Sequence, residues 1–100
     1  MNEIVVNALL EAEPGKAEEL EAALREVLAP SRAEDGNVLY ELHRDRKDPN
    51  RFMFHEIWKS ADAIKEHNGR AHYQKLSVTV GPLLAKPPAL STWTRVDPAS

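Results

Sequence analysis

Three polar side chains stand in stretches of the sequence that are otherwise apolar, and their types allow hydrogen-bond or proton chemistry. Asn7 interrupts the apolar run IVVNALL, and Glu56 lies between Phe54 and Trp58 on one face of a predicted strand. His67 falls on the apolar side of a short predicted helix. An amide can hydrogen-bond a ligand oxygen, a carboxyl group can take up a proton, and an imidazole exchanges protons near neutral pH. These residues are the first candidates for a functional site.

Each of the three also has a purely structural interpretation. The Asn7 amide could pair with a bulge or a neighbouring strand as readily as it could face a pocket. A buried carboxylate is costly without a partner, so Glu56 either forms an ion pair with Arg or Lys, which we favour, or lines a wet cleft. A lone inward-facing His is more often a hydrogen-bonded core residue than a catalyst. His67 is nevertheless the one inward-facing group of these helices that titrates near neutral pH.

The aromatic residues all fall in predicted strands or helices. They are Tyr40, Phe52, Phe54, Trp58, Tyr73 and Trp93. Most of them are expected to serve the core or a dimer interface. Their density near Glu56 and His67 also suits a flat aromatic ligand, which such rings would surround.

Several kinds of chemistry are excluded by what the sequence lacks. It has no cysteine, which excludes disulfides, thiolate catalysis and cysteine-type metal sites. Its 4 glycines form no dinucleotide or phosphate-binding fingerprint, and no G-x-S-x-G nucleophile motif occurs. His55-Glu56 would need a second His at position 59 to form a zinc-protease motif, and that position is Lys59.

Two histidines of the second helical segment are close in sequence. His67 and His72 are five residues apart, which places them about 140° apart around a regular helix. On such a helix the two imidazoles cannot share one metal ion. A site built from more distant histidines stays open, but no spacing in the sequence supports one, and we expect no metal site.

Length and composition set the class of protein. A chain of 100 residues and 11.2 kDa is expected to form one domain, residues 1–100, with a core over about 4–96 and a loose tail at 97–100. Its 13 Lys and Arg against 16 Asp and Glu give a net charge of −3 without a basic stripe, so we expect no nucleic-acid partner. The apolar runs are too short to cross a bilayer, and the acidic start does not look like a secretion signal. We therefore expect no membrane partner and a cytoplasmic location.

Apolar periodicity and turn residues predict the element order β-α-β-β-α-β. The predicted strands are Ile4–Leu10, Val38–Arg44, Arg51–Trp58 and Ala89–Val96. One amphipathic helix is predicted over Lys16–Ala29, with Pro30 ending or kinking it. A second helical segment begins after the N-cap Ser60 and is interrupted at Asn68-Gly69.

This order is that of the ferredoxin-like fold, an α+β arrangement in which a four-stranded antiparallel sheet carries helices on one face. Right-handed crossovers make 4-1-3-2 the simplest spatial strand order. A bulge within 52–58 would exchange the two faces of that strand, so the face that carries a cavity stays open. The second face also holds apolar residues (Leu39, Met53 and Ile57), and a second copy of the sheet would cover it. We therefore predict a twofold homodimer joined through the sheet face.

An ordered set of residues runs from the third predicted strand into the helices that follow. It consists of Phe54-His55-Glu56-Ile57-Trp58-Lys59-Ser60, then Ala63 and His67, then His72-Tyr73. Earlier positions that belong with it are Pro14-Gly15-Lys16, Asp35-Gly36, Tyr40 and Asp48-Pro49. Together they resemble the antibiotic biosynthesis monooxygenase family, whose core pattern is Glu-x-Trp, helix, His, aromatic. The resemblance covers nearly the whole chain, from Ile4 to about Val96.

The resemblance implies a dimeric α+β barrel and a cofactor-independent monooxygenase that oxidises a phenol, a quinol or a polyketide anthrone with O2. An electron-rich phenolate can itself pass an electron to dioxygen, so the implied enzyme needs no flavin, metal or other cofactor. On this interpretation His67 is the catalytic base or proton relay, and Asn7 and Tyr40 hydrogen-bond the substrate oxygen. The remaining substrate-binding residues are Phe54, Glu56, Trp58 and Tyr73.

Two alternatives stand beside this function. A non-catalytic dimeric module could bind a small molecule in the same cleft, because fold alone does not decide function. The family also includes heme-degrading relatives, which have an Asn on the first strand and a Trp and a heme-ligating His on the second helical segment. This sequence keeps Asn7 but has His67 at the Trp position and a hydroxyl, near Ser77, at the ligand position. His72 would have to act as a displaced ligand, so we rank heme chemistry third, after binding.

Overall fold

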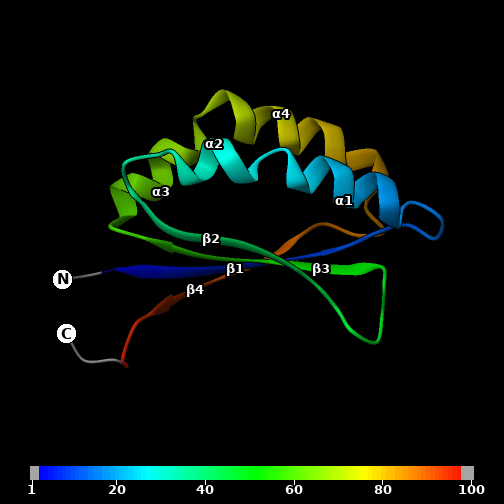
Figure 1. Ribbon diagram of the computed structural model, residues 1–100, viewed down its shortest axis with the longest axis horizontal. Helices are drawn as coiled ribbons and strands as arrows, with labels where there is room; N and C mark the ends of the chain where they lie inside the picture. Colours follow the sequence, from blue (N-terminus) through cyan, green and yellow to red (C-terminus); the bar gives the residue numbers. More distant parts are fainter. Residues whose placement is uncertain (1–2, 98–100) are drawn as a thin grey trace.

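The computed structural model describes residues 3–97 and has two layers, a four-stranded antiparallel sheet and a helical layer on one of its faces (Figure 1). The strands are β1 (Ile4–Glu11), β2 (Asn37–Arg44), β3 (Arg51–Trp58) and β4 (Ala89–Thr94). The helices are α1 (Ala17–Arg25), α2 (Leu28–Arg32), α3 (Ala61–Asn68) and α4 (Ala71–Val80), with a 3-10 turn, η1, at Gly81–Leu83. These elements confirm the predicted α+β, ferredoxin-like class.

β1 lies in the middle of the sheet because it pairs with β3 on one side and with β4 on the other, which gives the order β2-β3-β1-β4. Read from the opposite edge, this is the predicted order 4-1-3-2. Within the sheet Glu56 lies opposite Val6 of β1 and opposite Tyr40 of β2. The register therefore places these three side chains on one face.

A bulge in β2 and the regular alternation of β3 decide which sheet face meets the helices. The register between β2 and β3 shifts between Asn37 and Leu39, which leaves Val38 as the extra residue, 44% exposed. Beyond the bulge Tyr40 points inward and is 2% exposed. β3 alternates without a break, so its even-numbered residues from 52 to 58 are all buried beneath the helices.

The first helical segment breaks one turn earlier than the sequence analysis predicted. α1 ends at Arg25 and α2 begins at Leu28, so the single helix expected over 16–29 is wrong, and Pro30 lies inside α2. Pro30 sits in the first turn of α2, where its missing N–H is tolerated because that group would have no helical partner. In one continuous helix its ring would meet the carbonyl of Glu26, four residues earlier, and the chain departs from the helix there.

The second helical segment divides where the sequence predicted. Ser60 caps α3, and its hydroxyl accepts a hydrogen bond from the Ala63 N–H at 3.1 Å. α3 is followed by Gly69, and Arg70 then has an extended ψ of 149°, so α4 starts as a separate helix. Side chains on α3 and α4 therefore do not follow the angular spacing of one regular helix.

Gly36 brings the loop between α2 and β2 against α3. A Cβ atom at this position would collide with the Cβ of Ala63, so the close approach requires glycine. The Gly36 carbonyl also accepts a hydrogen bond from the Lys59 N–H at 2.9 Å. These contacts hold the loop against the start of α3. Glu34, two residues before Gly36, then lies within hydrogen-bond distance of His67 at the end of α3 and of His72 in α4.

The core lies between the sheet and the helical layer. Its largest fully buried side chains include Trp58 and Phe52 from β3 and Leu20 and Leu24 from α1, each 0–1% exposed. Within residues 3–97, none of the helices is long and apolar enough to span a membrane.

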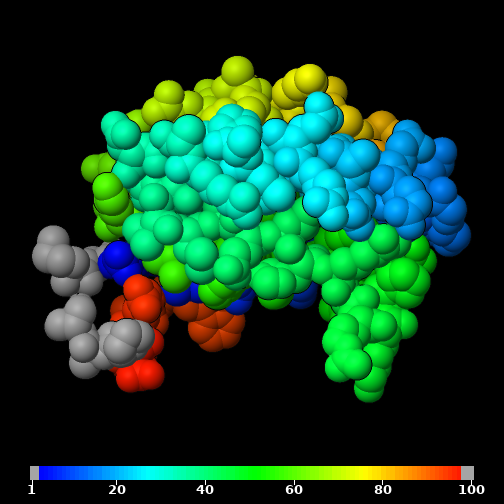
Figure 2. Space-filling model, in the orientation of Figure 1, coloured from blue at the N-terminus to red at the C-terminus, as the bar shows by residue number. Residues whose placement is uncertain are grey.

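The other face of the sheet carries no helix within residues 3–97 (Figure 1). Apolar side chains on that face include Leu9, 40% exposed, and Trp93, 57% exposed. In the same orientation, Figure 2 shows the β2–β3 hairpin projecting away from the helical layer. β4 ends at Thr94, two residues before its predicted end, and the predicted loose tail falls outside the described residues beyond Asp97.

Candidate functional site

A cavity of about 520 Å³ lies between the sheet and α4, on the helix-covered face. From the sheet it is lined by Ala8, Leu10, Tyr40, Phe54, Glu56 and Leu90. From α4 and the chain that follows it is lined by Tyr73, Leu76, Ser77, Val80, Gly81, Leu84, Lys86, Pro87 and Pro88. The lining is mainly apolar with a few polar groups, and the volume is in the range of pockets that hold small organic molecules.

Two of the residues that line the cavity are small. Ala8 presents only a methyl group from β1, and Gly81 follows α4 without a side chain. Two aromatic rings, Tyr40 and Phe54, lie side by side in its wall with their centroids 5.1 Å apart. A planar guest would therefore meet ring surfaces on the sheet side.

Glu56 presents a buried carboxyl group to this cavity. It is 6% exposed, and its Oε1 accepts a hydrogen bond from the Trp58 indole N–H at 2.8 Å. The ion pair with Arg or Lys that the sequence favoured is wrong, because the partner in the structure is an indole. Burial raises the Glu56 pKa to about 7; the indole N–H opposes that shift and the charge of Glu34 adds to it. This carboxyl group can hold or take up a proton near neutral pH.

Tyr40 supplies a hydroxyl that stays protonated. Burial, together with the charge of the neighbouring Glu56, raises the pKa of its phenol far above the ordinary value. Tyr73 lines the same cavity from α4 and is half-buried. The structure thus brings four of the predicted site residues to one cavity: Tyr40, Phe54, Glu56 and Tyr73.

His67 lies behind the cavity wall. It is 3% exposed, and its ring centroid is 4.5 Å from that of Trp58, 5.0 Å from that of Tyr73 and 5.6 Å from that of Tyr40. Burial lowers the pKa of the imidazole, while the hydrogen bond and the charge of Glu34 oppose that change. His67 is therefore a buried imidazole that contacts two residues of the cavity wall without lining the cavity.

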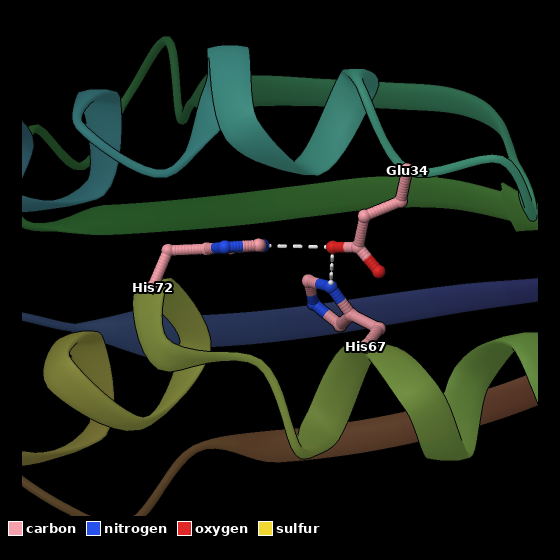
Figure 3. A group of neighbouring side chains, drawn as sticks. All are labelled: Glu34, His67 and His72. Carbon is pink, nitrogen blue, oxygen red and sulfur yellow. Dashed lines mark hydrogen bonds and ion pairs between the residues drawn. The ribbon is translucent and has the colours of Figure 1, made fainter.

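Glu34 joins His67 to His72 (Figure 3). Its Oε2 is 2.7 Å from Nδ1 of His67 and 2.7 Å from Nε2 of His72. The guanidinium of Arg70 lies near the other oxygen, with Nε 3.9 Å from Oε1. Glu34 was not among the predicted site residues. Two signals in the sequence pointed toward its contact with His67 and His72: the Asp35-Gly36 turn beside it and the predicted helix break at Asn68-Gly69.

The convergence of His67 and His72 corrects the argument made from one regular helix. Because the chain breaks between α3 and α4, ligand atoms of Glu34, His67 and His72 all lie within 4.8 Å of one another, close enough to surround a metal ion. Tetrahedral zinc with bonds of about 2.0–2.1 Å would hold its ligand atoms about 3.3 Å apart. The 2.7 Å contacts to Glu34 are hydrogen-bond lengths, so these three side chains form a hydrogen-bonded cluster here.

Besides His67, two predicted site residues do not line the cavity. Asn7 is on the face without helices, where its Oδ1 is 2.7 Å from Nδ1 of His55 on β3. Alternation along β1 puts its neighbours Val6 and Ala8 inward and Asn7 outward, so its amide cannot reach this cavity from the same chain. Trp58 is fully buried and contacts Glu56 rather than the cavity.

No histidine of residues 3–97 lines the cavity between the sheet and α4. His72 instead lines a separate hollow of about 130 Å³ beside Ala23 and Val27 of the first helical segment. Ser77, at the position where heme-degrading relatives carry their ligand, does line the cavity but offers only a hydroxyl. The described residues therefore provide no axial imidazole for a heme in this cavity.

Comparisons with known proteins agree with this architecture. The family described as "Antibiotic biosynthesis monooxygenase" matches residues 3–77. A Bacillus subtilis protein named "Putative monooxygenase YcnE" is 36% identical over 84 residues, which cover 84% of this chain and 88% of the relative. "Putative monooxygenase Rv0793" of Mycobacterium tuberculosis is 33% identical over 97 residues, or 97% of this chain and 95% of the relative.

Solved structures give the same result. The crystal structure of PA3566 from Pseudomonas aeruginosa has a TM-score of 0.92 and 34% identity, and covers 96% of each chain. The structure of Rv0793 has a TM-score of 0.92 and 32% identity, and covers 98% of this chain and 99% of the other.

Proposed function

The chain belongs to the antibiotic biosynthesis monooxygenase family, and from this premise we propose that it oxygenates an electron-rich aromatic compound. The substrate is a quinol, a phenol or a polyketide anthrone, the oxidant is O2, and no cofactor takes part. The names of the relatives support oxidoreductase chemistry, and the apolar, ring-lined cavity supports an aromatic substrate.

The observation that carries the proposal is the Glu56 carboxyl group in the wall of an apolar cavity. A phenol reacts with O2 far more readily once its proton is removed, and a base works best when its pKa is near the working pH. Glu56, with a pKa raised to about 7, meets that requirement and lies at the cavity itself. It takes the role of first proton acceptor, ahead of the more deeply placed His67.

The reaction then follows from the substrate's own chemistry. A carboxylate oxygen of Glu56 accepts the proton of the bound hydroxyl, and the phenolate passes one electron to O2. The substrate radical and superoxide combine to form the new C–O bond, and the second oxygen atom leaves as water. For a hydroquinone, one quinol and one O2 give one hydroxyquinone and one water, so all electrons come from the substrate. Bound substrate that fills the apolar cavity would keep the radical pair away from bulk water.

The other predicted residues are assigned roles that fit their positions. The Tyr40 hydroxyl, held protonated, donates a hydrogen bond to the substrate oxygen, and Phe54 and Tyr73 wall the ring system. Trp58 holds Glu56 through its indole N–H. His67 relays protons behind Tyr40 and Tyr73. Asn7, whose side chain is on the other face, orders the His55 ring there.

A second copy of this chain is proposed to cover the sheet face that lacks helices. Leu9 and Trp93 are half-exposed there, on either side of Asn7 along the paired strands, and large apolar side chains left in water favour a partner surface. A twofold axis would pack this face of one copy against the same face of the other copy. Sedimentation equilibrium should give a dimer for the wild type and a monomer for Trp93→Lys; a monomeric wild type would remove this part of the proposal.

Oxygen uptake in the presence of a metal chelator tests the function. Purified protein is supplied with a panel of hydroquinones and anthrones, and O2 consumption is followed with an electrode while products are identified by mass spectrometry. We expect consumption of one O2 per substrate and incorporation of one atom from ¹⁸O2. Tight binding of these compounds without turnover would instead identify a binding module, and neither binding nor turnover would reject the aromatic substrate class.

A further inference from the structure

One oxygen of Glu34 is shared by imidazoles from two different helices. Oε2 lies 2.7 Å from Nδ1 of His67 in the last turn of α3 and 2.7 Å from Nε2 of His72 in α4 (Figure 3). A carboxylate oxygen accepts hydrogen bonds, so each ring nitrogen that faces it carries a hydrogen. In a neutral imidazole only one nitrogen is protonated, and the contact therefore selects one tautomer for each ring.

The tautomer selected for His67 leaves its Nε2 as a bare proton acceptor. This atom is buried, has no hydrogen-bond partner among residues 3–97, and is on the part of the ring turned away from Glu34 (Figure 3). A buried polar atom without a partner is unusual in a protein and points to a functional use. The rings beside it include Tyr73 and Tyr40, both of which line the cavity.

We propose that Glu34 is a positioning residue that fixes His67 in the Nδ1–H tautomer, so that Nε2 serves as the proton acceptor behind the cavity wall. His72 donates to the same oxygen and keeps the carboxylate in place, and Arg70 lies 3.9 Å from the other oxygen. Glu34 does not line the cavity and acts only through His67. The catalytic consequence rests on the proposed function, whereas the tautomer can be measured without any activity.

The tautomer is measured by long-range ¹H–¹⁵N NMR of the wild-type protein, with the His67 signals assigned by their loss in His67→Gln. We expect Nδ1 of His67 to resonate as a protonated nitrogen and Nε2 as an unprotonated one. Glu34→Gln places an amide that can donate to Nδ1, so it should shift His67 toward the Nε2–H tautomer. Glu19→Gln makes the same chemical change at a side chain that is 65% exposed on α1, and it should leave the spectrum unchanged.

Steady-state kinetics test the consequence for the reaction. Proton transfer by a positioned side chain is worth ~10²–10⁴-fold in rate, so Glu34→Gln should lower kcat by about 10²-fold with little change in KM. Because Glu34 acts through His67, the double variant Glu34→Gln/His67→Gln should be no slower than His67→Gln alone. A purely structural role would instead give losses that multiply.

Several results would overturn the proposal. These are a wild-type His67 with hydrogen on Nε2, an unchanged tautomer in folded Glu34→Gln, and multiplicative losses in the double variant. Stoichiometric Zn²⁺ that shifts the signals of both imidazoles would show that the cluster is a metal site instead. If no quinol or anthrone is oxidised by the wild type, the proposed function fails, and the NMR result still decides the positioning role.

Discussion

Glu34 and Glu56 are two carboxyl groups of similar burial with different surroundings. The Glu34 side chain and the Glu56 residue are each 6% exposed. Glu34 accepts hydrogen bonds from two imidazoles at 2.7 Å and has Arg70 nearby. Glu56 accepts one hydrogen bond, from the Trp58 indole at 2.8 Å, and otherwise faces a cavity lined mainly by apolar side chains.

The difference shows that the partners of a carboxyl group, more than its depth, decide what it can do. One indole N–H does not replace the hydration that Glu56 loses, so its pKa rises to about 7 and its proton becomes exchangeable near neutral pH. Glu34 has lost water as well, but donors from two helices surround it and tie those helices to the loop before β2. The first group is suited to proton transfer and the second to fixing geometry.

The largest expected effect is on turnover. We expect Glu56→Gln to lower quinol-dependent O2 uptake by ~10²–10⁴-fold, because the amide cannot accept the substrate proton. Gln keeps an oxygen for the Trp58 indole, so circular dichroism should show a folded protein. Glu19→Gln is the matched control. Wild-type turnover in Glu56→Gln would place the proton acceptor elsewhere.

The next effect is on stability. Glu34→Ala should lower the free energy of unfolding by about 3 kcal/mol, because the buried His67 and the partly exposed His72 each lose an acceptor, at about 1–3 kcal/mol for a buried group. Glu56→Ala should be clearly less costly at pH 8, where it removes a desolvated charge. Urea unfolding monitored by tryptophan fluorescence measures both variants. Equal losses would mean that the two carboxyl groups do not differ as described.

The pH dependence of stability sharpens the comparison further. The folded-state pKa of Glu56 is raised from 4.5 to about 7, so its protonated form favours the folded state, and stability falls as pH rises from 4.5 to 7. At 1.36 kcal/mol per unit the total is about 3 kcal/mol. His67, whose pKa is lowered from 6.5, contributes the opposite slope below pH 6.5, but it does so in both proteins. The free energy of unfolding of the wild type minus that of Glu56→Gln should therefore fall by about 3 kcal/mol between pH 4.5 and pH 7. A difference that stays constant over this range would contradict the raised pKa of Glu56.

The smallest effect concerns the single donor to Glu56. Trp58→Phe removes the indole N–H while keeping an aromatic ring in the core, so the Glu56 pKa should rise further. A hydrogen bond to a charged group contributes about 1.5–3 kcal/mol, which corresponds to a shift of about 1–2 units. The acidic limb of the pH–rate profile should move to higher pH by that amount. If the acidic limb stays at the same pH in a folded Trp58→Phe variant, the indole N–H does not affect the Glu56 pKa.

Much of this architecture follows from the sequence because it depends on local patterns. Alternation in 51–58 fixed β3, the hydroxyl of Ser60 fixed the start of α3, and the crossover rule gave the strand order. Pro30 was predicted to end or kink a helix that reaches residue 29, but it lies in the first turn of α2. Proline disrupts the helical turn that precedes it and is tolerated in the first turn of a new helix.

The candidate site was harder to predict because its contacts join distant segments. The outward position of Asn7 follows from the alternation that places Val6 and Ala8 inward, but its pairing with His55 depends on sheet register. The meeting of Glu34 with His67 depends on how a loop passes Gly36 and on where one helix stops and the next begins. Neither periodicity nor residue type contains that information.

The two consecutive prolines in the cavity wall have a chemical consequence. Pro87 and Pro88 have no backbone N–H, so this stretch of the lining cannot donate a hydrogen bond. The polar side chains of the lining are those of Tyr40 and Glu56 on the sheet, Tyr73 and Ser77 on α4, and Lys86 just before the prolines. On the proposed function, a hydrogen bond to an oxygen of the aromatic substrate therefore comes from these side chains and not from the backbone of the two prolines.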